Sequence, residues 1–106
     1  MEPNEFLQTE EAIVAVLKTV YDPEIPVNVY DLGLIYNIDV DDVKNVEIDM
    51  TFTAPNCPLA DLIIEDVRMK VKSVKGVQSV KLNIVFEPEW NRDMMSEEAQ
   101  LELGFL

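Results

Sequence analysis

The feature that most constrains the fold is a change in hydrophobic periodicity within residues 51–58. Upstream, over residues 46–53, apolar and polar residues alternate, which is the pattern of a half-buried strand. Downstream, from Pro58 to about Val74, apolar residues recur every three or four positions, as in an amphipathic helix. Pro58 suits the first position of a helix, where its missing N–H costs nothing. The sequence therefore predicts a strand that is followed closely by a helix.

The rest of the chain shows the same two periods. Alternation predicts two further strands, and helical spacing predicts two further helices. Thr9 is the expected cap of the first helix, after a frayed lead-in over residues 1–8, and Ser96 is the expected cap of the last. The predicted elements are a helix over about 9–21, strands over 34–40 and 46–53, a helix over 58–74, a strand over 80–86 and a helix over 97–103.

This order, α-β-β-α-β-α, predicts an α+β fold. Because each strand has one apolar face, the expected architecture is a two-layer α/β sandwich with helices on one face of a three-stranded sheet. The sheet is antiparallel or mixed, depending on which neighbour the third strand pairs with. Tyr36 is expected on the core side of the first strand and Ile35 on its polar side. Thr51 and Thr53 are expected on the polar face of the second.

Composition favours one globular domain over residues 1–106, with its core over about 9–104. Hydrophobic residues make up 48% of the 106 residues and charged residues 27%. The formal net charge of −13 disfavours binding to nucleic acid or to anionic membrane surfaces. Residues 1–12 lack the pattern of a signal peptide, and no apolar run is long enough to span a bilayer. We therefore expect a soluble, cytoplasmic protein.

Cys57 is the only cysteine, and the sequence contains no histidine. At the expected cap of a helix, the dipole and the unpaired N–H groups favour the thiolate. Cys57 is therefore either a small buried hydrophobe or a thiolate ligand or transfer site. Cys–His catalysis lacks its base, and a closed zinc or iron-sulfur site needs about four ligands. Metal binding at Cys57 would thus be transient, shared between chains or completed by carboxylates.

Five further residues allow two interpretations each. Asp22, Glu24 and Asp31 lie in a loop rich in proline, where they either end the first helix and cap a turn or shape a cation site near the cysteine. Thr51 and Thr53 either reflect ordinary strand propensity or use their hydroxyls to order the segment that carries Cys57.

Two other groups of residues are candidates for binding surfaces. Trp90, Met94 and Met95 either cover the edge of a small core or form an exposed docking patch. The carboxylates over residues 39–49 indicate a solvated hairpin, because they lack the spacing of a calcium loop.

Two motifs together resemble the small family that includes SufT, PaaD and the eukaryotic cytosolic iron-sulfur targeting factors. The first motif reads Asp22-Pro23-Glu24-Ile25-Pro26, followed by Asp31-Leu32-Gly33. The second is Thr-x-Thr-x-Pro-x-Cys-Pro, which matches Thr51 through Pro58. A downstream Trp90 and the expected helix to Leu103 extend the resemblance over about 9–104. PaaD-like members carry further cysteines in a longer C-terminal part, so the resemblance is closest to stand-alone SufT-like members.

The resemblance implies an accessory, non-enzymatic role in assembling iron-sulfur clusters or delivering them to client proteins. It implies no cofactor held tightly by one chain, and at most transient iron or a transient cluster. The implied partners are the iron-sulfur assembly machinery, client apoproteins and, in one version, a second copy of the chain. The role is implied to depend on Cys57, surrounded by Asp22, Glu24, Asp31, Thr51 and Thr53.

Three alternatives remain open from the sequence. The chain is a metal-free adaptor that scaffolds an assembly complex, a PaaD-like accessory protein of phenylacetate degradation, or a thiol enzyme that acts through Cys57. The missing histidine and the missing second cysteine count against the last of these.

Overall fold

The computed structural model describes residues 3–21, 25–52 and 60–104, and the elements found there follow the predicted order. They are α1 (Pro3–Leu17), β1 (Ile35–Val40), β2 (Asn45–Met50), α2 (Ala60–Lys72), β3 (Ser79–Ile84), the short 3-10 helix η1 (Arg92–Met94) and α3 (Glu97–Glu102). The predicted α+β class is confirmed.

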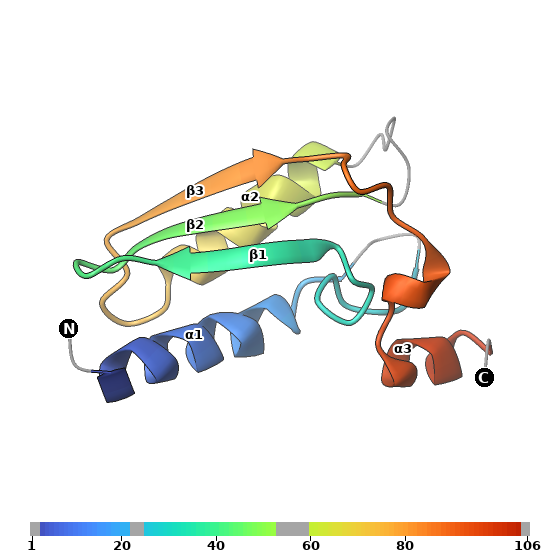
Figure 1. Cartoon of the computed structure of the whole chain (residues 1–106), viewed down its shortest axis with the longest axis horizontal. Coiled ribbons are helices and arrows are strands. Elements are labelled where there is room, and N and C mark those ends of the chain that lie inside the picture. Colours follow the sequence, from blue (N-terminus) through green and yellow to red (C-terminus); the bar gives the residue numbers. More distant parts are fainter. Residues whose placement is uncertain (1–2, 22–24, 53–59, 105–106) are drawn as a thin grey trace.

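The three strands form one mixed sheet in the order β1-β2-β3 (Figure 1). β1 and β2 form an antiparallel hairpin. β3 pairs parallel to β2, because the intervening α2 returns the chain to the starting edge of the sheet. The sequence allows either an antiparallel or a mixed sheet, and the structure has the mixed one. β2 is its central strand.

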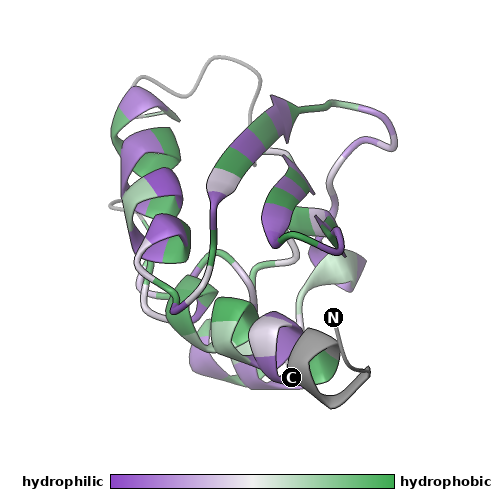
Figure 2. Cartoon of the chain, turned by 90° about the vertical axis from the view of Figure 1, so that its left-hand side faces the viewer, coloured by the Kyte–Doolittle hydropathy of each residue, from purple (hydrophilic) through white to green (hydrophobic). Residues whose placement is uncertain are grey.

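One face of the sheet carries the core. α1 packs against α2 and β1, and α2 packs against β3. Green and purple residues alternate along the strands, so the two faces differ in polarity (Figure 2). The fully buried side chains include Ile13, Leu17, Val46, Ile48, Met50, Val67 and Val71. The predicted arrangement of helices over the apolar face is therefore confirmed for α1 and α2.

A β-bulge reverses one prediction in β1. Ile35 lies opposite Met50, whereas Asn37 lies opposite Asp49, so β1 has one more residue than β2 over this stretch. Ile35 consequently packs against the core, although strict alternation had placed it on the polar face. After the bulge, Asn37 and Asp39 are exposed and Val40 is buried, as alternation predicts, so the extra residue changes the face of Ile35 alone among these, which a period of two cannot anticipate.

The first helix differs from the prediction at both ends. It begins at Pro3, so residues from that position on are helical rather than a frayed lead-in, and Thr9 is a buried residue within the helix rather than its cap. Proline suits the first turn, and no helix breaker follows it. The helix ends at Leu17, four residues earlier than expected, because the chain turns there and the N–H of Val29 bonds to the carbonyl of Val20 at 2.8 Å.

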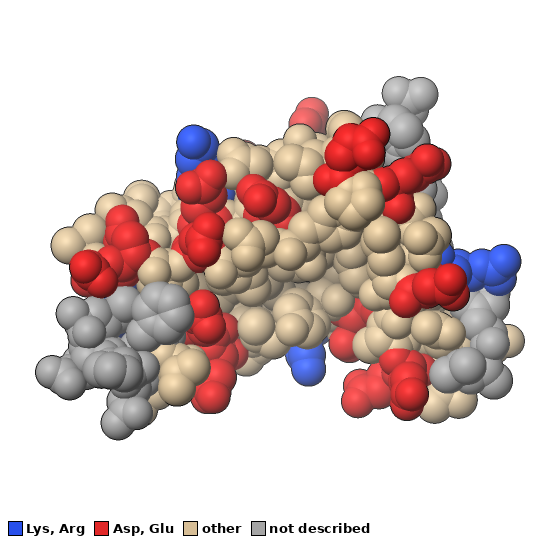
Figure 3. All heavy atoms as spheres, viewed as in Figure 1, with Lys and Arg blue, Asp and Glu red and all other residues tan. Residues whose placement is uncertain are grey.

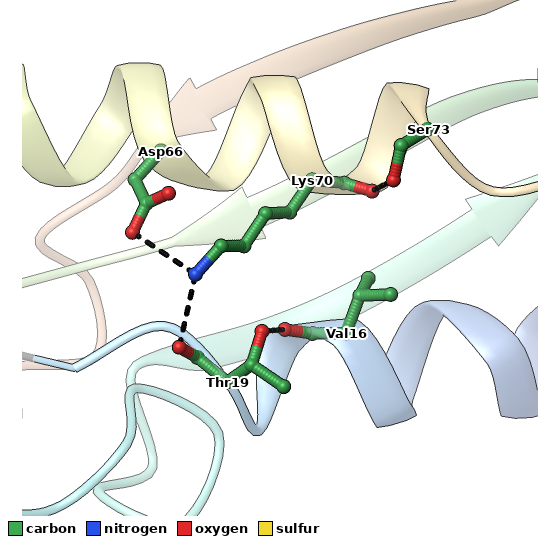
Figure 4. A network of polar contacts seen from close by, with 5 residues as sticks. All are labelled: Val16, Thr19, Asp66, Lys70 and Ser73. Carbon is green, nitrogen blue, oxygen red and sulfur yellow. Dashed lines mark hydrogen bonds and ion pairs between the residues drawn. The ribbon is translucent and has the colours of Figure 1, made fainter.

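A lysine joins the end of α1 to α2 (Figure 4). Lys70 donates from Nζ to the carbonyl oxygen of Thr19 at 3.0 Å, and its ion pair with Asp66 measures 3.5 Å. A cation near the last carbonyls of a helix complements its dipole. Thr19 closes the turn by donating its hydroxyl to the carbonyl of Val16 at 2.6 Å.

The predicted cap of the last helix agrees with the structure. Ser96 caps α3, because its hydroxyl accepts from the N–H of Ala99 at 3.1 Å. Gly76 adopts a φ of +88° after α2. In the part of the chain that the structure describes, no helix has the length and apolar character needed to cross a bilayer.

The hairpin turn between β1 and β2 is organised by one carboxylate. Asp41 accepts from the N–H of Asn45 at 2.8 Å, from the side-chain amide of Asn45 at 3.1 Å and from the N–H of Val43 at 3.0 Å. All three donors favour the charged form of the carboxyl group. The N–H of Asn45 contributes most to lowering the pKa of Asp41 below its usual 3.8.

We predict that the carboxyl group of Asp41 titrates with a midpoint below 3.8 in NMR spectra of the folded protein. Because the pKa is lower in the folded state, the carboxylate stabilises the hairpin above the unfolded pKa, and this contribution is lost as pH falls through the folded pKa. Asn45→Ala removes one of the three donors and should raise the midpoint only part of the way. A wild-type midpoint at or above 3.8 would contradict this account.

Candidate functional site

The two sequence motifs meet beside the carboxyl end of β2. The N–H of Thr51 donates to the carbonyl of Leu34 at 2.8 Å, which extends the β1–β2 ladder beyond the last paired residues. Leu34 is the last residue of the segment 25–34, which we call the Asp-Leu-Gly loop. The beginning of the cysteine motif therefore lies directly against the end of this loop.

The third strand continues at the same edge of the sheet. The N–H of Val85 donates to the carbonyl of Met50 at 2.9 Å, so the chain after β3 runs beside the end of β2. Met50, Thr51 and Phe52 are 0%, 1% and 5% exposed. The chain is thus anchored in the core immediately before residues 53–59, and α2 begins at Ala60.

The Asp-Leu-Gly loop is packed into the core despite its irregular backbone. Val29 and Leu32 are fully buried, and Val27 is 5% exposed. A short bridge pairs Tyr21 with Asn28. The burial of these three side chains makes the loop a fixed part of the fold rather than a linker.

Asp31 ties this loop together and joins it to α3. Its N–H donates to Oδ1 of Asn28 at 2.8 Å, and its Oδ2 accepts from Nδ2 of Asn28 at 2.8 Å. Its carbonyl accepts from the N–H of Ser96, the cap of α3, at 2.8 Å. The side chain of Asn28 therefore caps this turn, and the carboxylate of Asp31 holds the Asn28 amide in place.

The segment after β3 closes over the loop. The indole N–H of Trp90 donates to the carbonyl of Leu32 at 2.7 Å. Met95 is 7% exposed, and Trp90 packs partly buried against the core. Of the two interpretations of this tail, covering the edge of the core is therefore the one that fits.

Gly33 lies where the segment after β3 comes closest to the Asp-Leu-Gly loop. Its φ is +81°, and a Cβ built on it would lie 2.3 Å from the carbonyl oxygen of Met94. Only glycine fits here, because both the backbone conformation and the space exclude a side chain.

The predicted site residues are placed as follows. Asp31 and Thr51 lie within the described residues and belong to the two segments that the Thr51–Leu34 bond joins. Thr51 is buried, with 1% of its surface exposed. Asp22, Glu24, Thr53 and Cys57 lie outside the described residues.

Sequence reasoning missed Asn28, whose side chain holds Asp31 and is 9% exposed. The signal that would have found it is an asparagine three residues before an aspartate inside a predicted turn. Over residues 3–21, 25–52 and 60–104, no group of three or more His, Cys, Asp or Glu residues is arranged to hold a metal ion. In these ranges no buried side-chain nitrogen or oxygen atom lacks a hydrogen-bond partner.

The outer face of the sheet is acidic (Figure 3). Asp39 lies directly opposite Glu47 in the hairpin register. The side-chain amide of Asn83 donates to Glu47 at 2.6 Å and to Asp49 at 2.8 Å. At one end of β1, the hydroxyl of Tyr36 donates to the carbonyl of Pro88 at 2.8 Å, and burial raises the pKa of this tyrosine.

Comparison with known families identifies the chain. A family model described as iron-sulfur cluster assembly protein matches residues 10–82, a range that contains both motifs. The chain belongs to this family. The resemblance drawn from the two motifs is thereby confirmed.

Relatives of this family member cover almost its whole length. It is 76% identical to an Fe-S protein maturation auxiliary factor of Porphyromonas gingivalis, over 97% of this chain and 98% of that protein. It is 39% identical to the Fe-S protein maturation auxiliary factor SufT of Staphylococcus aureus, over 80% of this chain and 97% of that protein.

A solved structure supports the fold of this iron-sulfur assembly family member. The structure is a crystal structure of a domain of unknown function from Bacillus anthracis, which matches with a TM-score of 0.91 and 33% identity. The match covers 99% of this chain and all of the other.

We predict that Gly33→Ala lowers the free energy of unfolding by about 2–4 kcal/mol, because a methyl group there strains the backbone and meets the carbonyl of Met94. Gly104→Ala is the matched control. Its φ is +80°, but nothing lies within 4 Å of the added Cβ, so only the backbone strain of about 1 kcal/mol is expected. Urea unfolding followed by circular dichroism measures both changes. Equal losses for the two variants would show that the contact with Met94 is unimportant.

Proposed function

We propose that this protein is an accessory factor that assembles iron-sulfur clusters or delivers them to client proteins, acting through Cys57 rather than as an enzyme. The observation that carries the proposal is the family match over residues 10–82, which includes both motifs and Cys57. The relatives from Porphyromonas gingivalis and Staphylococcus aureus, both described as Fe-S protein maturation auxiliary factors, support the same role.

The fold fixes the positions of the residues that flank residues 53–59, the segment that contains Cys57. The chain enters residues 53–59 from Phe52, which is 5% exposed, and leaves them into the first turn of α2. The Asp-Leu-Gly loop is held against the entry point by the Thr51–Leu34 bond. The described residues on both sides of residues 53–59 are therefore held in the fold.

The chemistry assigned to Cys57 is that of one thiolate ligand or acceptor. A cluster usually needs four thiolates, and the sequence has one cysteine. Iron or a cluster, as cargo, would therefore be held transiently, either between two copies of the chain or between this chain and cysteines of a client protein. The assembly machinery and client apoproteins are the proposed partners.

The other predicted site residues take supporting roles in this proposal. Asp22, Glu24 and Thr53 are proposed to surround Cys57. Asp31 and Thr51 are proposed as positioning residues, since the Asp31 side chain is bonded to Asn28 and the Thr51 backbone to Leu34.

We predict that Cys57→Ser removes the activity of iron-sulfur client enzymes in cells that lack the wild-type protein. The substitution changes one atom, so circular dichroism and thermal unfolding should match the wild type. Val43→Ser is the control, because Val43 is 64% exposed in the hairpin turn and takes no part in either motif. Full client activity with Cys57→Ser would contradict the proposal and favour a metal-free adaptor.

Reconstitution distinguishes direct carriage from an adaptor role. The protein is incubated anaerobically with iron and sulfide, and its mass is measured under native conditions. Direct carriage predicts a cluster bound between two chains that disappears with Cys57→Ser. A metal-free monomer under all conditions would contradict carriage by two copies of the chain.

A further inference from the structure

We propose that the free edge of β3 binds an extended segment of a partner protein in which apolar residues alternate with carboxylates. β3 is an outer strand of the three-stranded sheet (Figure 1). Among the described residues, only β2 pairs with it. An outer strand presents a row of unpaired N–H and C=O groups, which can pair with one more strand.

The backbone groups of β3 point alternately toward β2 and away from it. The N–H of Val85 donates to the carbonyl of Met50 at 2.9 Å, so the backbone groups of Val85 point toward β2. Successive residues of a strand present their backbone groups in opposite directions. Val80, Leu82 and Ile84 therefore present theirs at the free edge, where they offer donors and acceptors to an added strand.

The same three residues carry apolar side chains that are incompletely buried. The residues paired with the first two of them on β2, Val46 and Ile48, are 2% and 0% exposed. Val80, Leu82 and Ile84 pack against the core but are only partly buried. Apolar surface thus remains in contact with water at the free edge, and an added strand would bury more of it.

One side of α2 forms a wall beside this edge. Lys72 donates from Nζ to the carbonyl oxygens of Val77 and Gln78, the two residues before β3. Residues four apart lie on the same face of a helix, so Arg68 and Ile64 continue from Lys72 along the face of α2 next to β3. Ile64 is partly buried against the core. An added strand would therefore meet one apolar and two basic side chains of α2.

The charge of this part of the chain is opposite to that of the whole. Residues 67–86 contain five of the eight basic residues and no acidic one, although the net charge of the chain is −13. Lys72, Lys75 and Lys81 are exposed. The ion pairs found among the described residues involve Arg68 and Lys70 instead. Carboxylates of a partner segment would complement the charge of the three exposed lysines.

Two other occupants fit this edge less well. A second copy of the chain, paired through a twofold axis, would bring the same basic surface against itself. A nucleic acid would be repelled by the rest of the chain, because all 21 acidic residues lie outside residues 67–86. The free edge of β3 does not include Cys57, so binding there is independent of the proposed function.

The test is an NMR titration of the full chain with the peptide acetyl-Val-Glu-Val-Glu-Val-Glu-amide. We expect saturable shifts along β3. At a free peptide concentration about ten times the dissociation constant, hydrogen exchange at the amides of Val80, Leu82 and Ile84 should slow roughly tenfold. The amides of Lys81 and Asn83 point toward β2, so they should be protected with and without the peptide.

Two control peptides separate the contributions of charge and apolar surface. The first has lysines in place of the glutamates, and repulsion from the basic surface should prevent saturable binding. The second has serines in place of the valines, so it keeps the charge but buries no apolar surface, and exchange at Leu82 should stay fast. Binding of either control as tight as that of the test peptide would overturn the inference.

Lys81→Glu and Lys18→Glu form a matched pair of variants. Both change the net charge equally, but Lys18 follows α1, which packs against β1 at the other edge of the sheet, and its Nζ lies 5.5 Å from the centre of the Tyr30 ring. Lys81→Glu should weaken the test peptide roughly three- to tenfold, as expected for reversing one exposed charge. Lys18→Glu should change the affinity less than about twofold. Circular dichroism checks that both variants are folded.

Four outcomes would overturn the inference. The first two are the absence of saturable shifts on β3 and equal effects of the two substitutions. The third is exchange at Leu82 that slows as the protein concentration rises without any peptide, which would assign the edge to a second copy of the chain. The fourth is tighter binding of a single-stranded DNA oligonucleotide at the same residues, which would assign it to nucleic acid.

Discussion

The organisation of the site depends on one backbone hydrogen bond, from the N–H of Thr51 to the carbonyl of Leu34 at 2.8 Å. It joins the first residue of the cysteine motif to the end of the Asp-Leu-Gly loop, although the two are separated by the whole β1–β2 hairpin. Thr51 is 1% exposed, and a buried backbone bond of this kind is costly to leave unmade. The described parts of the two segments, residues 25–34 and Thr51, therefore form one structural unit.

The C-terminal segment completes this unit from the other side. Trp90 bonds to the carbonyl of Leu32 at 2.7 Å, and Ser96 bonds to the carbonyl of Asp31 at 2.8 Å. Gly33 allows the backbone of Met94 to approach closely. The loop is thus held by the sheet on one side and by the tail on the other. Trp90 and α3 therefore have a structural role at this loop.

Much of the fold could be predicted from the sequence, because its strands and helices follow clear periods. The Ser96 cap depends on a local signal, and this prediction agrees with the structure. A strand is followed by a helix as predicted, but the expected start of that helix at Pro58 lies outside the described residues. The extra residue in β1 and the parallel pairing of β3 depend on contacts between distant segments. Periodicity carries no information about such contacts, so it predicts the wrong face for Ile35 and does not determine the strand order.

The candidate site was predictable in its composition but not in its geometry. The motifs include Asp31 and Thr51. Only the structure reveals that the side chain of Asn28 bonds to that of Asp31 and that the carbonyl of Leu34 accepts from the N–H of Thr51. Amide hydrogen exchange at Thr51 tests this account most directly. The account predicts that the Thr51 amide is protected as strongly as those of Ile48 and Met50 in the central strand. Exchange at the rate of an unstructured chain would contradict the claim that the two segments form one unit.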